Sequence, residues 1–96
     1  MRKRGKWMKS PDDSILEYIR DNGSGNPSDI SDVEEIRFSY GYIADRCSVL
    51  AEYGLLERLG NAVYVLTDEG ESYLDEELDT GTLSRNHATS GRSAAV

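Results

Sequence analysis

Apolar residues recur at helical spacing in three successive stretches of this chain. They lie three or four positions apart, which places each set on one face of a helix. The sets are Ile15, Leu16 and Ile19, then Ile30, Val33 and Ile36, then Ile43, Cys47 and Leu50. The pattern predicts three helices that bury these faces in a common core.

Capping residues stand where these helices should begin. The expected N-caps are Ser10, either Asn26 or Ser28, and Ser39. Pro11 and Pro27 suit the first turn of a helix. The third helix is expected over 39–53, with Gly54 as its left-handed stop. We expect Phe38, in the connection before this helix, to fill the core.

The pattern then changes to two short extended runs. Strands over 55–59 and 62–66 are expected to be joined by Gly60-Asn61, with glycine at the position that needs a positive φ. Thr67 caps a fourth helix. The expected inward positions are Leu55, Val63 and Val65 in the hairpin and Tyr73, Leu74 and Leu78 in the helix. The order predicts an α+β winged helix-turn-helix fold, with a three-helix core, a two-stranded wing and a C-terminal helix, and leaves room for a short strand after the first helix.

Charge divides the chain unequally. The sequence holds 11 basic and 18 acidic residues, for a net charge of −7, yet its first nine residues hold five basic and no acidic ones. We predict a flexible basic arm over 1–10, with Trp7 and Met8 docking at its end, a folded domain over 11–79 and a disordered tail over 80–96. An acidic body is typical of a protein that functions in molar salt, where the Debye length is about 3 Å and the repulsion between its carboxylates is screened. The alternative is an ordinary acidic protein.

The residues that usually carry catalysis are scarce. The only histidine, His87, lies in the predicted tail, which argues against a His-based triad on the core, and Cys47 is the only cysteine. The sequence shows no glycine-rich phosphate loop, and no apolar run approaches the ~20 residues needed to cross a bilayer. We predict a cytoplasmic protein that is no enzyme, with no metal, cofactor, small-molecule ligand or membrane partner.

Helical geometry separates the core of segment 39–53 from its outer face. With 100° per residue and Ile43 at the centre, Cys47 and Leu50 face inward. The outward or flanking positions of its first half are Tyr40, Gly41, Tyr42, Asp45 and Arg46. In a docked helix-turn-helix this face enters the major groove of DNA.

These side chains offer groups that DNA recognition uses. Arg46 could bind a guanine edge or a phosphate, and Asp45 could accept from a cytosine amine. The hydroxyls of Ser39 and Tyr42, near a positive helix end, suit a phosphate oxygen. Alternatively, Asp45 and Arg46 form a solvated face, Ser39 acts only as a cap, and Tyr42 is a half-buried aromatic residue.

Two other elements could touch the backbone or the minor groove. The candidates are Arg58 and Asn61 in the wing and Arg2, Lys3, Arg4 and Lys6 in the arm. The arm could instead serve only as a solubilising tail.

Residues 39–74 contain a characteristic series of positions. It reads Ser39-x-x-Tyr42-Ile43-x-x-Arg46-Cys47-x-x-Leu50-x-x-x-Gly54-Leu55-Leu56, then Gly60-Asn61-x-Val63-Tyr64-x-Leu66-Thr67-x-x-Gly70-x-x-x-Leu74. The chain resembles, over about residues 11–79, haloarchaeal winged-helix DNA-binding proteins of the phage phi-H repressor-like group, and is similar more broadly to MarR- and ArsR-type regulators. The resemblance implies a sequence-specific regulator that binds double-stranded DNA as a homodimer and has no catalytic residues.

The resulting hypothesis is a transcriptional regulator, and most simply a repressor that occludes promoter DNA. Helix 39–53 would enter the major groove, with hairpin 55–66 as the wing beside it. The alternative is a winged-helix module that binds another protein and no DNA, which the acidic body favours.

Overall fold

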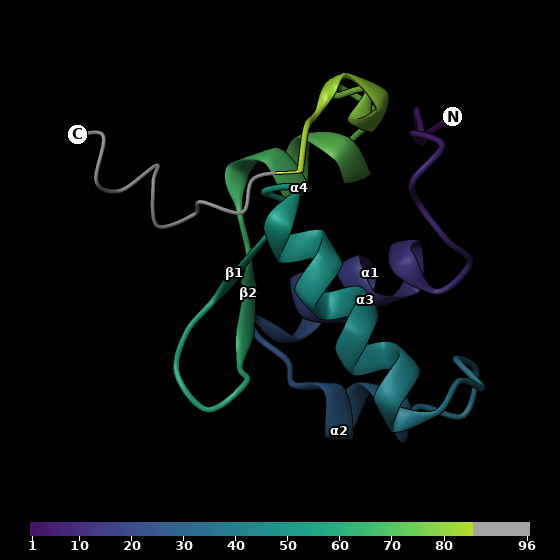
Figure 1. Cartoon of the computed structure of the whole chain (residues 1–96), viewed down its shortest axis with the longest axis vertical. Coiled ribbons are helices and arrows are strands. Elements are labelled where there is room, and N and C mark those ends of the chain that lie inside the picture. The colour runs from purple at the N-terminus through teal and green to yellow at the C-terminus, as the bar shows by residue number, and fades with distance from the viewer. Residues whose placement is uncertain (86–96) are drawn as a thin grey trace.

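Helices and one hairpin make up the computed structural model, which describes residues 1–85 (Figure 1). The elements are α1 (Asp12–Asn22), α2 (Pro27–Ser31), α3 (Tyr40–Glu52), β1 (Leu56–Arg58), β2 (Tyr64–Leu66), α4 (Asp68–Leu74) and the 3-10 helix η1 (Thr80–Thr82). This order confirms the predicted α+β winged helix-turn-helix. The hairpin tip points toward the end of the molecule that holds α2, while α4 and η1 lie at the other end.

The predicted inner faces of the first and third helices form the centre of the core. Six of these side chains are at most 1% exposed, namely Ile15, Leu16, Ile19, Ile43, Cys47 and Leu50. The second helix is shorter than its apolar pattern suggested: α2 ends at Ser31, and Ile36 is buried from the turns that follow. Asn26 is its cap and accepts from the Asp29 amide at 2.8 Å, which decides between the two predicted caps.

The strands β1 and β2 pair antiparallel, and Gly25 adds a third strand position at their edge. The Gly25 amide donates to the Tyr64 carbonyl at 3.0 Å, and the Tyr64 amide donates back at 2.7 Å. Leu55 is buried as predicted, but the prediction that Val63 and Val65 face inward is wrong, because both are only half-buried. Side chains alternate along a strand, so the register that buries Tyr64 turns its neighbours away from the core.

The hairpin turn lies one residue later than predicted. The Val63 amide donates to the Gly60 carbonyl at 3.2 Å, so Asn61 and Ala62 are the central residues. Their φ angles are 58° and 59°, whereas Gly60 is outside the left-handed region. Asn tolerates this conformation, but the Cβ of an alanine makes it unfavourable by roughly 1–2 kcal/mol.

The N-terminal segment 1–10 lies against α1, in contrast to the free arm predicted from its charge. Arg2 pairs with Glu17 and lies 3.5 Å from Asp13, both on α1. Arg4 lies 3.7 Å from the same Asp13. The physical reason is that the acidic face of α1 offers these guanidinium groups partners within the fold.

Aromatic contacts fix the same segment to the end of α3. Trp7 stacks on Tyr53 with ring centroids 3.7 Å apart and planes 1° from parallel. The Trp7 indole donates to the Thr80 carbonyl at 3.0 Å, and Met8 is buried nearby. The predicted docking of Trp7 and Met8 is confirmed.

Residues 80–85 belong to the folded body rather than to the predicted tail. Thr80 is fully buried, and its hydroxyl accepts from the Gly5 amide at 2.7 Å. A tail dominated by small polar residues looks disordered by composition, but here one threonine satisfies backbone groups of a distant segment. The rest of that predicted tail, including His87, lies outside the described residues.

A buried ion pair joins the start of α1 to the middle of α3. Arg46 donates to both carboxylate oxygens of Asp12, from Nε at 2.9 Å and from Nη2 at 2.7 Å. Nη2 also donates to the Trp7 carbonyl at 3.2 Å. Asp12 is 0% and Arg46 6% exposed. The hydrogen bond to Asp12 raises the pKa of Arg46 above its ordinary value, so the guanidinium is charged at neutral pH.

The prediction that Arg46 faces outward is therefore wrong. On the helix it lies only 60° from Ile43, on the side that packs against α1. The prediction that Ser10 caps the first helix is also wrong. No side chain caps α1 at Pro11, and the Lys9 amide before it donates to Asp12 at 2.9 Å.

Removing one partner of this pair should destabilise the fold strongly. Asp12→Ala leaves the Arg46 guanidinium buried without a counter-charge, and we expect the free energy of unfolding to fall by about 3–5 kcal/mol. The control is Arg20→Ala, which removes a surface pair with Asp75 at 3.3 Å and should cost about 1 kcal/mol or less. Urea unfolding in molar KCl measures both. Equal losses in the two variants would contradict the importance of the buried pair.

Relieving the strained turn should stabilise the protein. Ala62→Gly is expected to raise the free energy of unfolding by about 1 kcal/mol, because glycine adopts a positive φ without a Cβ clash. Gly60→Ala is the matched control, since an added Cβ there meets nothing within 4 Å. Thermal unfolding provides the measurement, and a lower Tm for Ala62→Gly than for the wild type would refute the argument.

Candidate nucleic-acid interface

The first turns of α3 carry several exposed side chains. Ser39 caps the helix, as predicted, by accepting from the Tyr42 amide at 3.2 Å. Tyr40 is 57% exposed, and Gly41 and Asp45 are also exposed. An added Cβ on Gly41 would meet nothing within 4 Å, so this position leaves open space beside the helix. These residues form an accessible face at the start of α3.

An aromatic pair stands at the base of this face. Phe38 is 36% exposed, and its ring lies 5.3 Å from that of Tyr42 at an angle of 44°. The prediction that Phe38 fills the core is wrong, because Ile36 is the buried residue of this connection. Tyr42 is also 36% exposed, so its ring is partly buried, as the alternative expected, and partly accessible at the surface.

Two arginines are exposed near the predicted interface elements, one directly before α3 and one in the hairpin. Arg37 is exposed in the connection before the helix, with a φ of 59°, and Arg58 is exposed at the end of β1. The ion pairs within residues 1–85 use other cations, so both guanidinium groups are open to a ligand. Asn61 is exposed at the hairpin turn. Sequence reasoning missed Arg37, because one arginine in an irregular connection gives no periodic signal.

Carboxylates outnumber these cations on α2, on α3 and in their connection. The exposed acidic residues there are Asp29, Asp32, Glu34, Glu35 and Asp45. Arg37 is the exposed cation of the same stretch, and Arg58 is the exposed cation of the hairpin. The sequence-independent attraction of this end of the molecule for phosphates is therefore weak.

The basic N-terminal residues lie in a different part of the molecule. The backbone of Lys3 forms a parallel β-bridge with that of Asp79, next to η1, and Figure 1 places the segment toward the end that holds α4 and η1. Arg2 and Arg4 are engaged with α1, whereas Lys3 and Lys6 are exposed. The structure does not bring these four predicted contacts together with the start of α3 or the hairpin turn.

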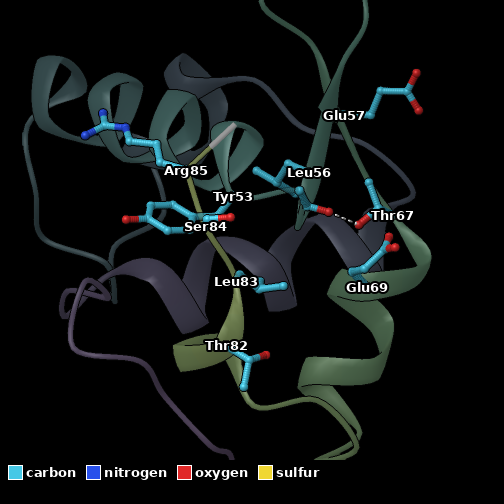
Figure 2. A pocket seen from close by; sticks show the side chains of 10 residues that line it. Tyr53, Leu56, Glu57, Thr67, Glu69, Thr82, Leu83, Ser84 and Arg85 are labelled. Carbon is cyan, nitrogen blue, oxygen red and sulfur yellow. Dashed lines mark hydrogen bonds between the residues drawn. The ribbon is translucent and has the colours of Figure 1, made fainter. Parts of the chain in front are cut away.

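A hollow of about 620 Å³ opens between the end of α3, the hairpin, the start of α4 and residues 82–85 (Figure 2). Glu57, Glu69 and Arg85 line it together with several hydroxyl groups. The Thr67 hydroxyl, which caps α4 as predicted, donates across it to the Gly54 carbonyl at 2.6 Å. The hollow lies on the α4 side of the fold, and the absence of a small-molecule ligand stays a prediction.

Groups for other chemistry are not assembled in residues 1–85. In this part of the chain, no three His, Cys, Asp or Glu side chains are placed to hold a metal ion. Burial raises the pKa of the Cys47 thiol to about 12, so the thiol is protonated and unreactive at neutral pH. Within the same residues, no helix is both long and apolar enough to span a membrane.

Comparison with known proteins agrees with this fold. The family described as winged helix-turn-helix phage repressor matches residues 1–86. The repressor protein of Halobacterium phage phiH is 37% identical, over 88% of this chain and 99% of the phage protein. The crystal structure of the PhiH1 repressor-like protein from Haloarcula marismortui superposes with a TM-score of 0.85 at 45% identity, covering 88% of this chain and 97% of that one.

A more distant structure shares the fold alone. The reduced form of MarR from E. coli superposes with a TM-score of 0.63 at 22% identity, over 75% of this chain and 52% of the MarR chain. The family match spans all the described residues, including the N-terminal segment and residues 80–85. The chain therefore belongs to the winged helix-turn-helix phage repressor family of DNA-binding repressors.

Proposed function

We propose that this protein binds one class of operator DNA sequence-specifically and represses transcription by occluding a promoter. The start of α3 enters the major groove, and the hairpin contacts the flanking backbone or minor groove as a wing. Two copies bind as a homodimer on cytoplasmic double-stranded DNA. The observation that carries this proposal is the accessible first half of α3 beside a hairpin, in a chain whose relatives include a phage repressor protein.

The exposed residues suggest how the contacts are divided. Arg37, directly before α3, and Arg58, in the hairpin, are both exposed and are suited to phosphates. The hydroxyls of Tyr40 and Tyr42, the open space at Gly41 and the carboxylate of Asp45 face the groove, where a carboxylate can accept from a cytosine amine. Ser39 holds the first turn of α3 in place as its cap. Arg46 has no part in DNA contact, because Asp12 holds it inside the fold.

A protein-binding function is the second candidate, favoured by the excess of carboxylates near α2 and α3. In that case the start of α3 would attract a basic partner surface rather than phosphates. Selection from a random DNA pool at high KCl separates the two functions. Enrichment of one sequence supports the repressor, and failure to retain any sequence in the salt where the protein is folded would contradict it.

We expect a shallow dependence of DNA affinity on salt. With two phosphate-facing arginines per protomer, log K should fall against log[KCl] with a slope no steeper than about −2 per protomer. Arg37→Ala and Arg58→Ala should each reduce this slope by about 1. Fluorescence anisotropy with the selected site gives the slopes.

Lys3→Ala and Lys6→Ala are the matched controls for charge. Both lysines are exposed in the N-terminal segment, whose Lys3 carbonyl and Gly5 amide bond to Thr80 of η1 and not to α3, so the slope should stay unchanged. If the lysine variants flattened the slope and the arginine variants did not, the DNA would have to lie along the N-terminal segment instead of α3.

A further inference from the structure

Large apolar side chains at the surface are concentrated around the proposed reading face. Within residues 1–85 they are Met1, Phe38, Tyr40, Tyr42 and Leu59. Three of these lie in or directly before the first turn of α3, and Leu59 lies in the hairpin beside β1. Exposed aromatic rings are unfavourable in water, and more so in molar salt, so a surface that keeps them at one place indicates contact with a partner there.

Phe38 and Tyr42 form a paired unit within this group. Their ring centroids are 5.3 Å apart in a tilted arrangement, which is a favourable aromatic contact. Tyr42 is held on the capped first turn of α3, and Phe38 packs against it from the connection. The pair is therefore positioned before any ligand binds, which lowers the entropy lost on binding.

Phe38 carries no hydrogen-bonding group, which restricts what it can recognise. In the major groove of DNA the base edges present donors, acceptors and a single apolar group, the C5 methyl of thymine. Because few cations surround this face, phosphate attraction contributes little, and contacts to base edges must supply most of the discrimination.

We propose that the Phe38–Tyr42 pair reads the C5 methyl of a thymine in the operator. This inference rests on the proposed DNA-binding function and names the specificity determinant within it. Phe38 supplies the apolar surface, and Tyr42 orients it from the first turn of α3. Leu59 is a contrasting case, because a wing in the minor groove meets no thymine methyl.

The test replaces each thymine of the selected operator, one at a time, by deoxyuridine, which lacks only the methyl group. For the wild type, replacement of one particular thymine in each half-site should weaken binding about fourfold, because the burial of one methyl group is lost. Phe38→Ala should bind the unmodified operator about fourfold more weakly and show no further loss with deoxyuridine. Leu59→Ala is the matched control, a truncation of another exposed apolar side chain, and it should keep the full wild-type penalty.

A second measurement uses the unaltered protein, so its outcome does not depend on the folding of a variant. Operator with 5-iododeoxyuridine at the sensitive position is irradiated with the wild type, and the crosslinked peptide is mapped. An adduct at Phe38 or Tyr42 is expected. An adduct elsewhere, no sensitive thymine, or a penalty that persists in Phe38→Ala would overturn this inference while leaving DNA binding intact. Failure of the wild type to bind the selected DNA would instead refute the proposed function itself.

Discussion

The buried pair of Asp12 and Arg46 fixes how α3 sits on α1. A charge buried without a partner is strongly unfavourable, so α3 can dock stably only where its guanidinium meets that carboxylate. The contact is bidentate, so it restricts the orientation of the two side chains as well as the distance between them. A third hydrogen bond, to the Trp7 carbonyl, ties the N-terminal segment to the same group. In residues 1–85, every buried side-chain nitrogen and oxygen has a partner.

This pair also decides which face of α3 reaches the surface. With Arg46 turned toward α1 and Ile43 in the core, the positions opposite Ile43, such as Gly41 and Asp45, must point away from the core. The far end of α3 is held by a second contact, the stack of Tyr53 on Trp7. The N-terminal segment is thus a structural strap along the inner side of α3, and it leaves the outer side free for a ligand.

Local signals in the sequence predicted most of the fold. The spacing of Ile15, Leu16 and Ile19 depends only on helical geometry, and Ser39 and Thr67 cap helices through amides three residues away. Such features need no knowledge of distant partners. The α+β winged helix-turn-helix, its element order and the accessible start of α3 were therefore available from the residues alone.

The features that sequence reasoning missed depend on residues far away in the chain. Arg46 is ambiguous on a helical wheel until Asp12, 34 positions earlier, is known to lie opposite it. The basic segment looks like a free arm until α1 supplies its carboxylates. Phe38 could equally well have been the core residue, because Ile36 lies two positions before it and only the path of the chain decides between them.

The distribution of cations fits a protein that recognises DNA in concentrated salt. Arg2, Arg4 and Arg46 are paired with carboxylates of the same chain, whereas Arg37 and Arg58 are the exposed cations of the proposed interface. Counterion release drives phosphate binding strongly only when the bulk salt is dilute, so additional surface cations would gain little affinity in molar KCl. Apolar contacts, by contrast, are strengthened when salt is excluded from the surface. An interface with few charges and exposed aromatic rings is therefore what these conditions favour, and it trades non-specific attraction for discrimination between base pairs.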